Sequence, residues 1–223
     1  MTTHQDDRLA AVLWDLDGTV VDTEPLWMDA EQELADAHGK TWTQEDGLKL
    51  VGNSLIESGI YIQKRLEIDM SPEEIVDYLV RRLSRRLKEG PISWRPGARE
   101  LLNALKSEGV PMALVTMSYK SIADPIVEHL PFDAVVTGDA VTHGKPHPEP
   151  YLKAAELLGV DPSECVAIED SGTGAASAHA AGCQVLVVPH FVNVADAPRR
   201  TETPTLVGVT PNDLVNLLNG RGL

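Results

Sequence analysis

Hydrophobic residues follow two different periods along the chain, and the change between them divides it into parts. Apolar runs at Leu9–Leu13, Pro111–Thr116 and Cys165–Ile168 are short and nearly continuous, as in strands buried on both faces of a parallel sheet. Shorter runs at 134–137 and 184–188 have the same character. Stretches with apolar residues every three or four positions lie between them and predict helices. This alternation predicts an α/β fold with a doubly wound, Rossmann-like parallel sheet.

One long stretch after the first strand has helical spacing and no strand pattern. Thr43, Ser54 and Ser71 are each followed three residues later by an acidic residue, a pattern typical of helix starts. We therefore expect residues 23–93 to form an all-helical cap inserted into the fold. Residues 1–22 and 94–223 are then expected to form the Rossmann-like core.

Two carboxylates, Asp15 and Asp17, stand where the first strand ends. Side chains alternate on extended chain, so both can leave the strand end while Leu16 stays in the core. Gly18 permits the tight turn by which the chain leaves the sheet. Two ionised acids this close repel unless a cation lies between them or one keeps a proton. The pair therefore indicates a metal site, a proton-transfer site, or both.

Polar residues also follow the other strands. The second strand is followed by Thr116 and Met117, where a hydroxyl and backbone amides open a helix and suit a phosphate. Lys145 lies in a Pro-flanked loop after the third strand, and Glu169 and Asp170 follow the fourth. Ligands of doubly wound sheets bind beyond the carboxyl ends of the strands. We therefore expect these side chains to share one site with the first acid pair.

Composition limits the class of partner. The apolar share of 43% is enough for a core, and the net charge of −15 argues against nucleic acid or an anionic membrane as partner. An anionic substrate would need local positive charge from a metal or a placed lysine. Cys165 and Cys183 adjoin apolar runs and are expected in the core. The arginines at 81, 82, 85 and 86 fit a solvated helix face. With neither a signal peptide nor a membrane span visible, we expect a cytoplasmic protein.

The four strand-end motifs resemble, in order, those of the haloacid dehalogenase superfamily of phosphotransferases. The first is Asp15-x-Asp17-Gly18-Thr19, followed by Asp-Thr-Glu, and the second is Thr116. The third is the lysine in Gly-Lys-Pro-His-Pro-Glu-Pro, and the fourth is the acid pair in Ile-Glu-Asp-Ser. A helical cap between the first two motifs is similar to that of the β-phosphoglucomutase-like and phosphoglycolate-phosphatase-like branch.

The resemblance implies a role for each motif. Asp15 would be the nucleophile that forms an aspartyl-phosphate, and Asp17 the general acid and base. The catalytic set would be completed by Thr116 and Lys145. The residues that the resemblance assigns to the phosphate are Asp15, Gly18, Thr116, Met117 and Lys145. Those that it assigns to a Mg²⁺ ion are Asp15, Asp17 through its main-chain carbonyl, Glu169 and Asp170.

Three functions then compete. The first is a Mg²⁺-dependent phosphatase acting on a small phosphorylated metabolite such as a sugar or polyol phosphate. The second is a β-phosphoglucomutase-like phosphomutase, and the third a signalling module that only accepts a phosphoryl group. The cap and Asp17 argue against the third, and we expect a monomer or a weak homodimer.

Two absences argue against the mutase. Those mutases carry a His shortly after Asp-Thr, where this chain has Trp27, and a cap Arg that segment 51–55 lacks. Arg65 or the arginines near Arg85 could replace that Arg from elsewhere in the cap.

Overall fold

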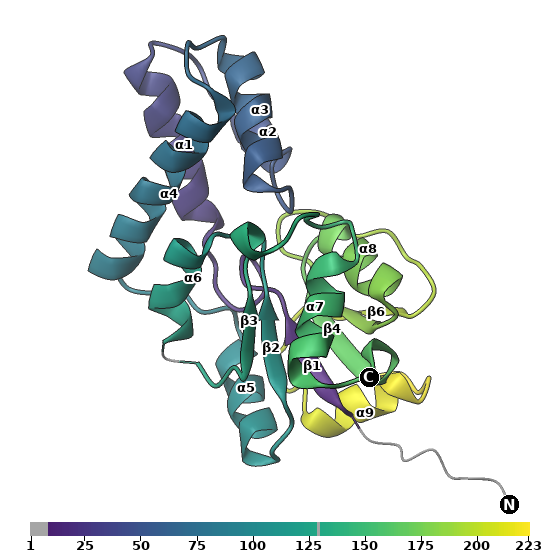
Figure 1. The fold of residues 1–223 in the computed structure, drawn as a ribbon. Coiled ribbons are helices and arrows are strands. Elements are labelled where there is room, and N and C mark those ends of the chain that lie inside the picture. The colour runs from purple at the N-terminus through teal and green to yellow at the C-terminus, as the bar shows by residue number, and fades with distance from the viewer. Residues whose placement is uncertain (1–8, 129) are drawn as a thin grey trace, which may run out of the picture.

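Six parallel strands form one sheet in the computed structural model, which describes residues 9–128 and 130–223 (Figure 1). Their order across the sheet is β3–β2–β1–β4–β5–β6. The strands are β1 (Ala11–Trp14), β2 (Met112–Val115), β3 (Ala134–Val136), β4 (Cys165–Glu169), β5 (Gln184–Val187) and β6 (Arg200–Glu202). The order reverses between β1 and β4, as expected of a doubly wound fold. The predicted α/β class is confirmed.

Helices cover both faces of the sheet, and alternate side chains of each strand contact opposite layers. Val12 and Trp14 of β1 pack in the core under one layer, formed by α5 (Ala98–Ser107), α6 (Lys120–Val127) and α9 (Pro211–Leu218). Ala11 and Leu13 pack under the other layer, formed by α7 (Glu149–Leu158) and α8 (Gly172–Ala181). Burial on both faces explains why the strand sequences are continuously apolar. Short 3₁₀ helices span Gly138–Ala140 and Pro162–Glu164.

Four helices lie between β1 and α5 and stand outside the sheet (Figure 1). We call residues 23–93 the helical insert; it contains α1 (Glu24–Ala37), α2 (Gln44–Leu48), α3 (Leu55–Leu66) and α4 (Pro72–Glu89). Thr43, Ser54 and Ser71 form the capping boxes that their spacing predicts. The side-chain oxygen of each accepts a hydrogen bond from the backbone amide three residues later. The apolar stripe of α4 is buried inside the insert.

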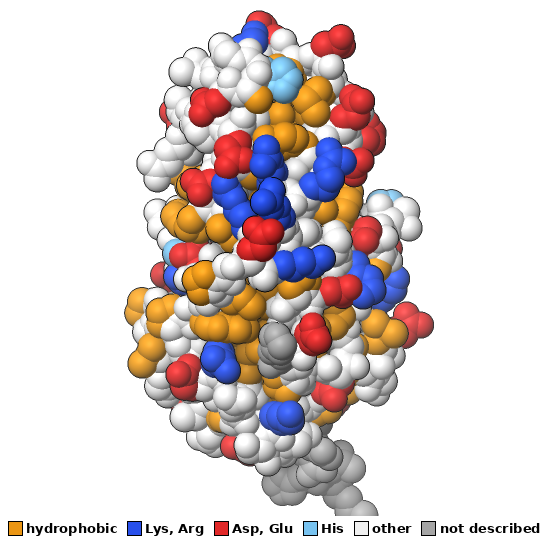
Figure 2. Space-filling view, turned by 90° about the vertical axis from the view of Figure 1, so that its left-hand side faces the viewer, with side chains coloured by type: hydrophobic (Ala, Val, Ile, Leu, Met, Phe, Trp, Pro, Cys, Tyr) orange, Lys and Arg blue, Asp and Glu red, His pale blue; other side chains and the backbone are white. Residues whose placement is uncertain are grey.

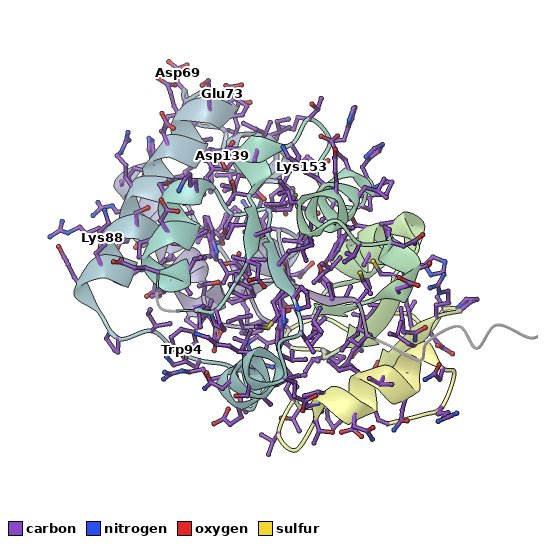
Figure 3. The ribbon with its side chains drawn as sticks, turned by 60° about the horizontal axis from the view of Figure 1, so that its bottom comes forward. Asp69, Glu73, Lys88, Trp94, Asp139 and Lys153 are labelled. Carbon is purple, nitrogen blue, oxygen red and sulfur yellow. The ribbon has the colours of Figure 1, made fainter. Side chains whose placement is uncertain are left out.

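Two chain segments that run side by side connect the insert to the core. Val21 and Trp94 form an antiparallel bridge, and the amide of Asp22 donates to the carbonyl of Ser93 at 2.7 Å. Trp94 lies beside α5 (Figure 3), where the guanidinium of Arg99 is 5.0 Å from its ring centroid. The insert therefore leaves the core and returns to it at one place, next to the end of β1.

Helix α6 runs through Pro125 without interruption, which was not predicted, because a proline usually breaks the interior of a helix. Proline has no amide hydrogen, so the carbonyl four residues earlier, that of Ser121, loses its helical donor. Ser84 of α4 supplies a replacement, its hydroxyl donating to that carbonyl at 3.2 Å. The same hydrogen bond joins the insert to the core.

Strand β6 was not predicted either. Its residues, Arg200–Glu202, are polar, and it lies at the edge of the sheet, where it pairs with β5 alone. An edge strand that is not buried on both faces has no continuous apolar run to reveal it.

Three arginines of α4 pair with acidic side chains on the outside of the insert, namely Arg82, Arg85 and Arg86. Figure 2 shows basic side chains gathered beside acidic ones on this face of the molecule. Arg86 lies 2.5 Å from Glu33 of α1, and Arg85 lies 3.1 Å from Glu89. The interpretation as a solvated helix face agrees with these pairs. Among residues 9–128 and 130–223, no helix has both the length and the apolar composition needed to cross a membrane.

Candidate active site

The carboxyl ends of three neighbouring strands bring the candidate residues of the sequence motifs together. Asp15 directly follows β1, which pairs with β2 on one side and β4 on the other. Thr116 directly follows β2, and Glu169 is the last residue of β4. Lys145 comes from the loop before α7. Residues up to 154 positions apart therefore meet because parallel strands end at the same edge of the sheet.

A buried lysine bridges two of the carboxylates. The ammonium of Lys145 donates to Oδ1 of Asp15 at 2.7 Å and to Oε1 of Glu169 at 2.5 Å, and all three side chains are buried. Burial lowers the pKa of Lys145, but the attraction of these two carboxylates outweighs it and leaves the pKa raised. The lysine therefore stays charged and supplies fixed positive charge at the site.

Two carboxylate oxygens at the site have no donor. Oδ2 of Asp15 and Oδ2 of Asp170 are buried and accept no hydrogen bond from any described residue. Burial raises the pKa of Asp15 to about 7, with Lys145 opposing the rise and Glu169 adding to it. The pKa of Asp170 is raised well above its usual range, first by burial and then by the charge of Asp15. Two unpartnered buried oxygens of this kind are costly without a cation.

These acids fit a divalent metal ion. One ligand oxygen from each of Asp15, Glu169 and Asp170 lies within 4.8 Å of the others. Hard oxygen donors of this kind are what Mg²⁺ prefers, and the two unpartnered oxygens are free to coordinate. The chemistry of the donor set therefore suits Mg²⁺.

Glu169 is already engaged by the protein. Besides Lys145, the phenol of Tyr151 donates to its Oε1 at 2.6 Å, and the hydroxyl of Ser171 donates to Oε2 at 3.3 Å. The carboxylate also lies against the start of α8, where a Cβ at Gly174 would come within 1.9 Å of Oε1. Its position is therefore set by surrounding groups, and the sequence analysis did not single out Tyr151.

Three hydroxyls hold the side chain of Asp17. Thr23 donates to Oδ1 at 2.5 Å, while Ser118 and Thr116 donate to Oδ2 at 2.8 and 3.1 Å. This carboxylate is not part of the three-residue acidic group described above. Thr116, expected to contact phosphate, here contacts Asp17. Thr23 and Ser118 were not predicted as site residues, although Ser118 directly follows Met117 and Thr23 belongs to the Asp-Thr-Glu motif.

Gly18 and Met117 shape the floor of the site. The backbone of Gly18 has φ of 87°, in the left-handed region, and a Cβ there would come within 2.1 Å of Oδ2 of Asp170. Its amide donates to the carbonyl of Val21 at 2.8 Å. The sulfur of Met117 accepts from the amide of Lys145 at 3.2 Å, which ties the lysine loop to the end of β2.

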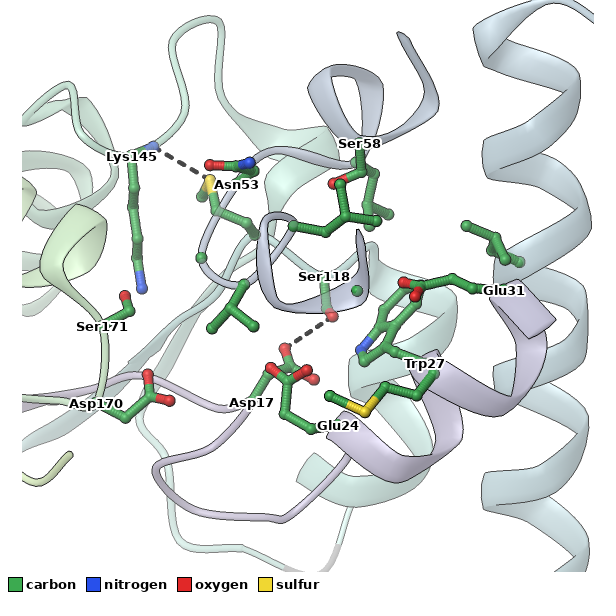
Figure 4. A pocket seen from close by; sticks show the side chains of 18 of the residues that line it. Asp17, Glu24, Trp27, Glu31, Asn53, Ser58, Ser118, Lys145, Asp170 and Ser171 are labelled. Carbon is green, nitrogen blue, oxygen red and sulfur yellow. Dashed lines mark hydrogen bonds between the residues drawn. The ribbon is translucent and has the colours of Figure 1, made fainter. Parts of the chain in front are cut away.

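A pocket separates these residues from the helical insert (Figure 4). The core contributes Asp15, Asp17, Met117, Ser118, Lys145, Asp170 and Ser171, and the insert contributes Glu24, Trp27, Met28, Glu31, Gly47, Leu50, Val51, Gly52, Asn53, Leu55, Ser58 and Leu79. Two of the insert residues are buried acids. Burial raises the pKa of Glu24 to about 8, helped by the charge of Asp17, and that of Glu31 to about 7.

Neither of these two acids was predicted as a site residue. A signal was present, because Glu24 belongs to the Asp-Thr-Glu motif and Glu31 follows it by seven residues. On a helix, this spacing of about two turns places both on one face.

A second group of possible metal ligands lies on the surface. The rings of His143 and His147 are 4.6 Å apart, and Glu149 accepts from the ring of His143 at 2.9 Å. The loop brings these residues together without the helix that their spacing would otherwise need. Glu149 also accepts from the amides of residues 142 and 143, so it closes the loop before α7.

The chain is similar to a known family of proteins and to individual members of it. Residues 9–182 match the model of the haloacid dehalogenase-like hydrolases. The phosphorylated carbohydrates phosphatase of Thermotoga maritima is 33% identical over an alignment of 219 positions that covers 94% of this chain and 98% of that protein. Hexitol phosphatase A of Escherichia coli is 36% identical over an alignment of 200 positions that covers 87% of this chain and 88% of that protein.

A solved structure agrees over nearly the whole length. CbbY of Rhodobacter sphaeroides in complex with phosphate has a TM-score of 0.82 at 27% identity, covering 93% of this chain and 99% of that one. The family model and the relatives each extend over most of the chain. The chain therefore belongs to the haloacid dehalogenase-like hydrolase family, as an enzyme of the phosphoric monoester hydrolase class.

Proposed function

We propose that the enzyme hydrolyses a small phosphorylated metabolite, a sugar or polyol phosphate, with Mg²⁺ and through a phosphorylated aspartate. The observation that carries this proposal is the buried cluster in which Lys145 bridges Asp15 and Glu169 while Asp15 and Asp170 each keep one unpartnered oxygen. The relatives named as phosphatases of phosphorylated carbohydrates and hexitols support the substrate class.

In this proposal Asp15 attacks phosphorus. One of its oxygens forms the new O–P bond while the bond from phosphorus to the ester oxygen breaks. Lys145 orients the carboxylate through its 2.7 Å hydrogen bond and offsets negative charge on the transferring group.

Asp17 acts as the general acid and then as the general base. It donates one to the leaving alkoxide, and then accepts one from the water that attacks the aspartyl-phosphate, releasing inorganic phosphate and free Asp15. The three hydroxyls of Thr23, Thr116 and Ser118 hold this carboxylate beside the pocket.

The remaining residues hold the metal and the phosphate. Asp15, Asp170 and the main-chain carbonyl of Asp17 would hold Mg²⁺, with Glu169 ligating directly or through water. When bound, the ion supplies positive charge to the phosphoryl oxygens. Thr116 and the backbone of Met117 complete the phosphate site, and Gly18 leaves the space in which Asp170 lies.

We further propose that residues 23–93 act as a cap over a core formed by residues 1–22 and 94–223. The pocket is lined from both sides, and the paired segments at Val21 and Trp94 join the two parts at one place. A cap of this kind excludes water during transfer and selects the organic part of the substrate.

A phosphomutase is the second candidate, and the charges of the residues that line the pocket argue against it. A mutase must hold a second phosphate on the cap side, which calls for a cation there. Arg65 instead pairs with Asp46 at 2.8 Å and Arg85 with Glu89, and neither lines the pocket. Lys145 is the single Lys or Arg among the described lining residues. Water is therefore the better acceptor.

Phosphate release from a panel of esters tests the proposal. The panel contains hexose and hexitol monophosphates, β-glucose 1-phosphate and p-nitrophenyl phosphate, each with Mg²⁺ and with chelator. We expect Mg²⁺-dependent release of inorganic phosphate without a bisphosphate activator. Faster conversion of β-glucose 1-phosphate to glucose 6-phosphate than release from any ester would identify a mutase instead.

A further inference from the structure

The insert's side of the pocket carries two buried carboxylates. Glu24 is 8% exposed and Glu31 is 4% exposed, and both line the pocket from α1. Figure 4 shows them on either side of Trp27, with Glu24 nearer to Asp17 and Glu31 farther from the strand ends. Acidic side chains this buried are uncommon unless another group compensates them.

Most of their oxygens lack a donor. Oε2 of Glu31 accepts from the indole nitrogen of Trp42 at 3.0 Å. Within residues 9–128 and 130–223, Oε1 of Glu31 and both oxygens of Glu24 accept no hydrogen bond. Since both side chains line the pocket, donors from a bound molecule can reach these oxygens. Burial also raises the pKa of both groups, and the single hydrogen bond from Trp42 only partly opposes the rise at Glu31.

The charge of the pocket is divided between its two ends. Lys145 and the proposed metal ligands lie at the core end, where a phosphoryl group would bind. The insert's side offers the two acids together with the neutral polar side chains of Asn53 and Ser58, and its described lining residues include no Lys or Arg. An anionic group bound there would be buried with no cation beside it and would repel the ionised form of either acid, which is strongly unfavourable. Hydroxyl groups would donate to the free oxygens.

We infer that Glu31, with Glu24 beside it, selects the organic part of the substrate, so that the enzyme takes monophosphate esters of neutral polyhydroxylated compounds and rejects esters with a second anionic group. This inference rests on the proposed phosphatase function. It assigns Glu31 as a specificity-determining residue, with its free oxygen accepting a substrate hydroxyl. Trp27, between the two acids, supplies an apolar wall for the carbon chain.

A matched pair of substrates tests the inference. Glucitol 6-phosphate and 6-phosphogluconate share a carbon skeleton and differ at the carbon farthest from the phosphate, which carries a hydroxymethyl group or a carboxylate. We expect kcat/KM of the wild type to favour glucitol 6-phosphate by about tenfold or more. Glu31→Gln keeps an acceptor for Trp42 but turns the pocket-facing oxygen into an amide donor. We expect this preference to fall by about tenfold or more in the variant, because the hydroxyl loses its acceptor and the carboxylate gains a donor.

Glu33→Gln is the matched control. It makes the same change two residues later on α1, at a side chain that pairs with Arg86 and does not line the pocket, so the preference should stay as in the wild type. Glu24→Gln provides a second test and should lower the preference in the same direction. Because both substrates undergo the same chemical step, their ratio cancels any effect of a variant on proton transfer.

The outcomes separate the two proposals. If the wild type released phosphate from p-nitrophenyl phosphate but used both esters equally, the inference would be overturned while the phosphatase function stood. An unchanged ratio in folded Glu31→Gln and Glu24→Gln would also overturn it. No phosphate release from any of the three esters would overturn the proposed function itself.

Discussion

The phenol of Tyr151 and the carboxylate of Glu169 form a buried hydrogen bond of 2.6 Å, on the same oxygen that accepts the ammonium of Lys145. A helix behind the sheet thus helps to set the position of a carboxylate at the strand end. Glu169 lies between this helix and the start of α8. Its carboxylate and the ammonium of Lys145 are both buried, so their opposite charges compensate each other away from solvent. The site therefore depends on side chains that do not line the pocket.

Tyr151→Phe is expected to destabilise the protein by about 1–2 kcal/mol, because it removes one donor from a buried carboxylate and keeps the ring. Denaturant unfolding in chelator measures the change without a contribution from bound metal. Tyr78→Phe, at a half-buried tyrosine of α4, is the matched control and should cost less. Equal costs for the two variants would show that the hydrogen bond to Glu169 adds little.

Asp15→Asn is expected to lower phosphate release by at least about a thousandfold, because an amide cannot accept the phosphoryl group. The fold should remain, since the amide oxygen can still accept from Lys145. Steady-state phosphate release and circular dichroism measure the two effects. The control is Asp69→Asn, at an exposed aspartate near the tip of the insert (Figure 3). Comparable turnover in the purified Asp15→Asn protein would remove Asp15 as the nucleophile.

Chelation is expected to abolish activity, and excess Mg²⁺ to restore it. Three buried acids in one group repel one another, and a cation relieves that repulsion. Mg²⁺ should therefore also raise the melting temperature of the wild type, and Asp170→Asn should reduce this rise more than Asp69→Asn does. Thermal unfolding with and without Mg²⁺ measures it independently of catalysis. Full activity in chelator from metal-free protein would count against the metal site.

Glu31→Gln is expected to stabilise the protein at neutral and higher pH. Burial raises the pKa of Glu31 to about 7, above the usual value of about 4.5 for a glutamate. The wild type therefore loses stability as the pH rises from about 4.5 through 7. Glutamine does not ionise and escapes this loss, so the variant's advantage should grow over that window, to about 3 kcal/mol, and level off above it. Urea unfolding at several pH values measures the difference, with Glu33→Gln as the control. An advantage that does not depend on pH would contradict the raised pKa.

Local patterns in the sequence were sufficient for much of the fold. The capping boxes at Thr43, Ser54 and Ser71 form within three residues, so their formation needs no distant partner. The apolar runs predicted five of the six strands, because burial on both faces leaves a continuous signal. Strand β6 left none, since its polar residues pair at the edge of the sheet.

The sequence by itself also determined which residues end the strands, and hence that Asp15, Thr116, Glu169 and Asp170 would face one edge of a parallel sheet. What surrounds them was decided by the tertiary structure alone. The contact between Ser118 and Asp17 joins residues 101 positions apart, and that between Ser84 and the carbonyl of Ser121 joins the insert to the core. Such contacts leave no periodic trace, because they depend on how whole elements pack. The place of Glu24 and Glu31 in the pocket also depends on how whole elements pack, because the insert forms one side of the pocket.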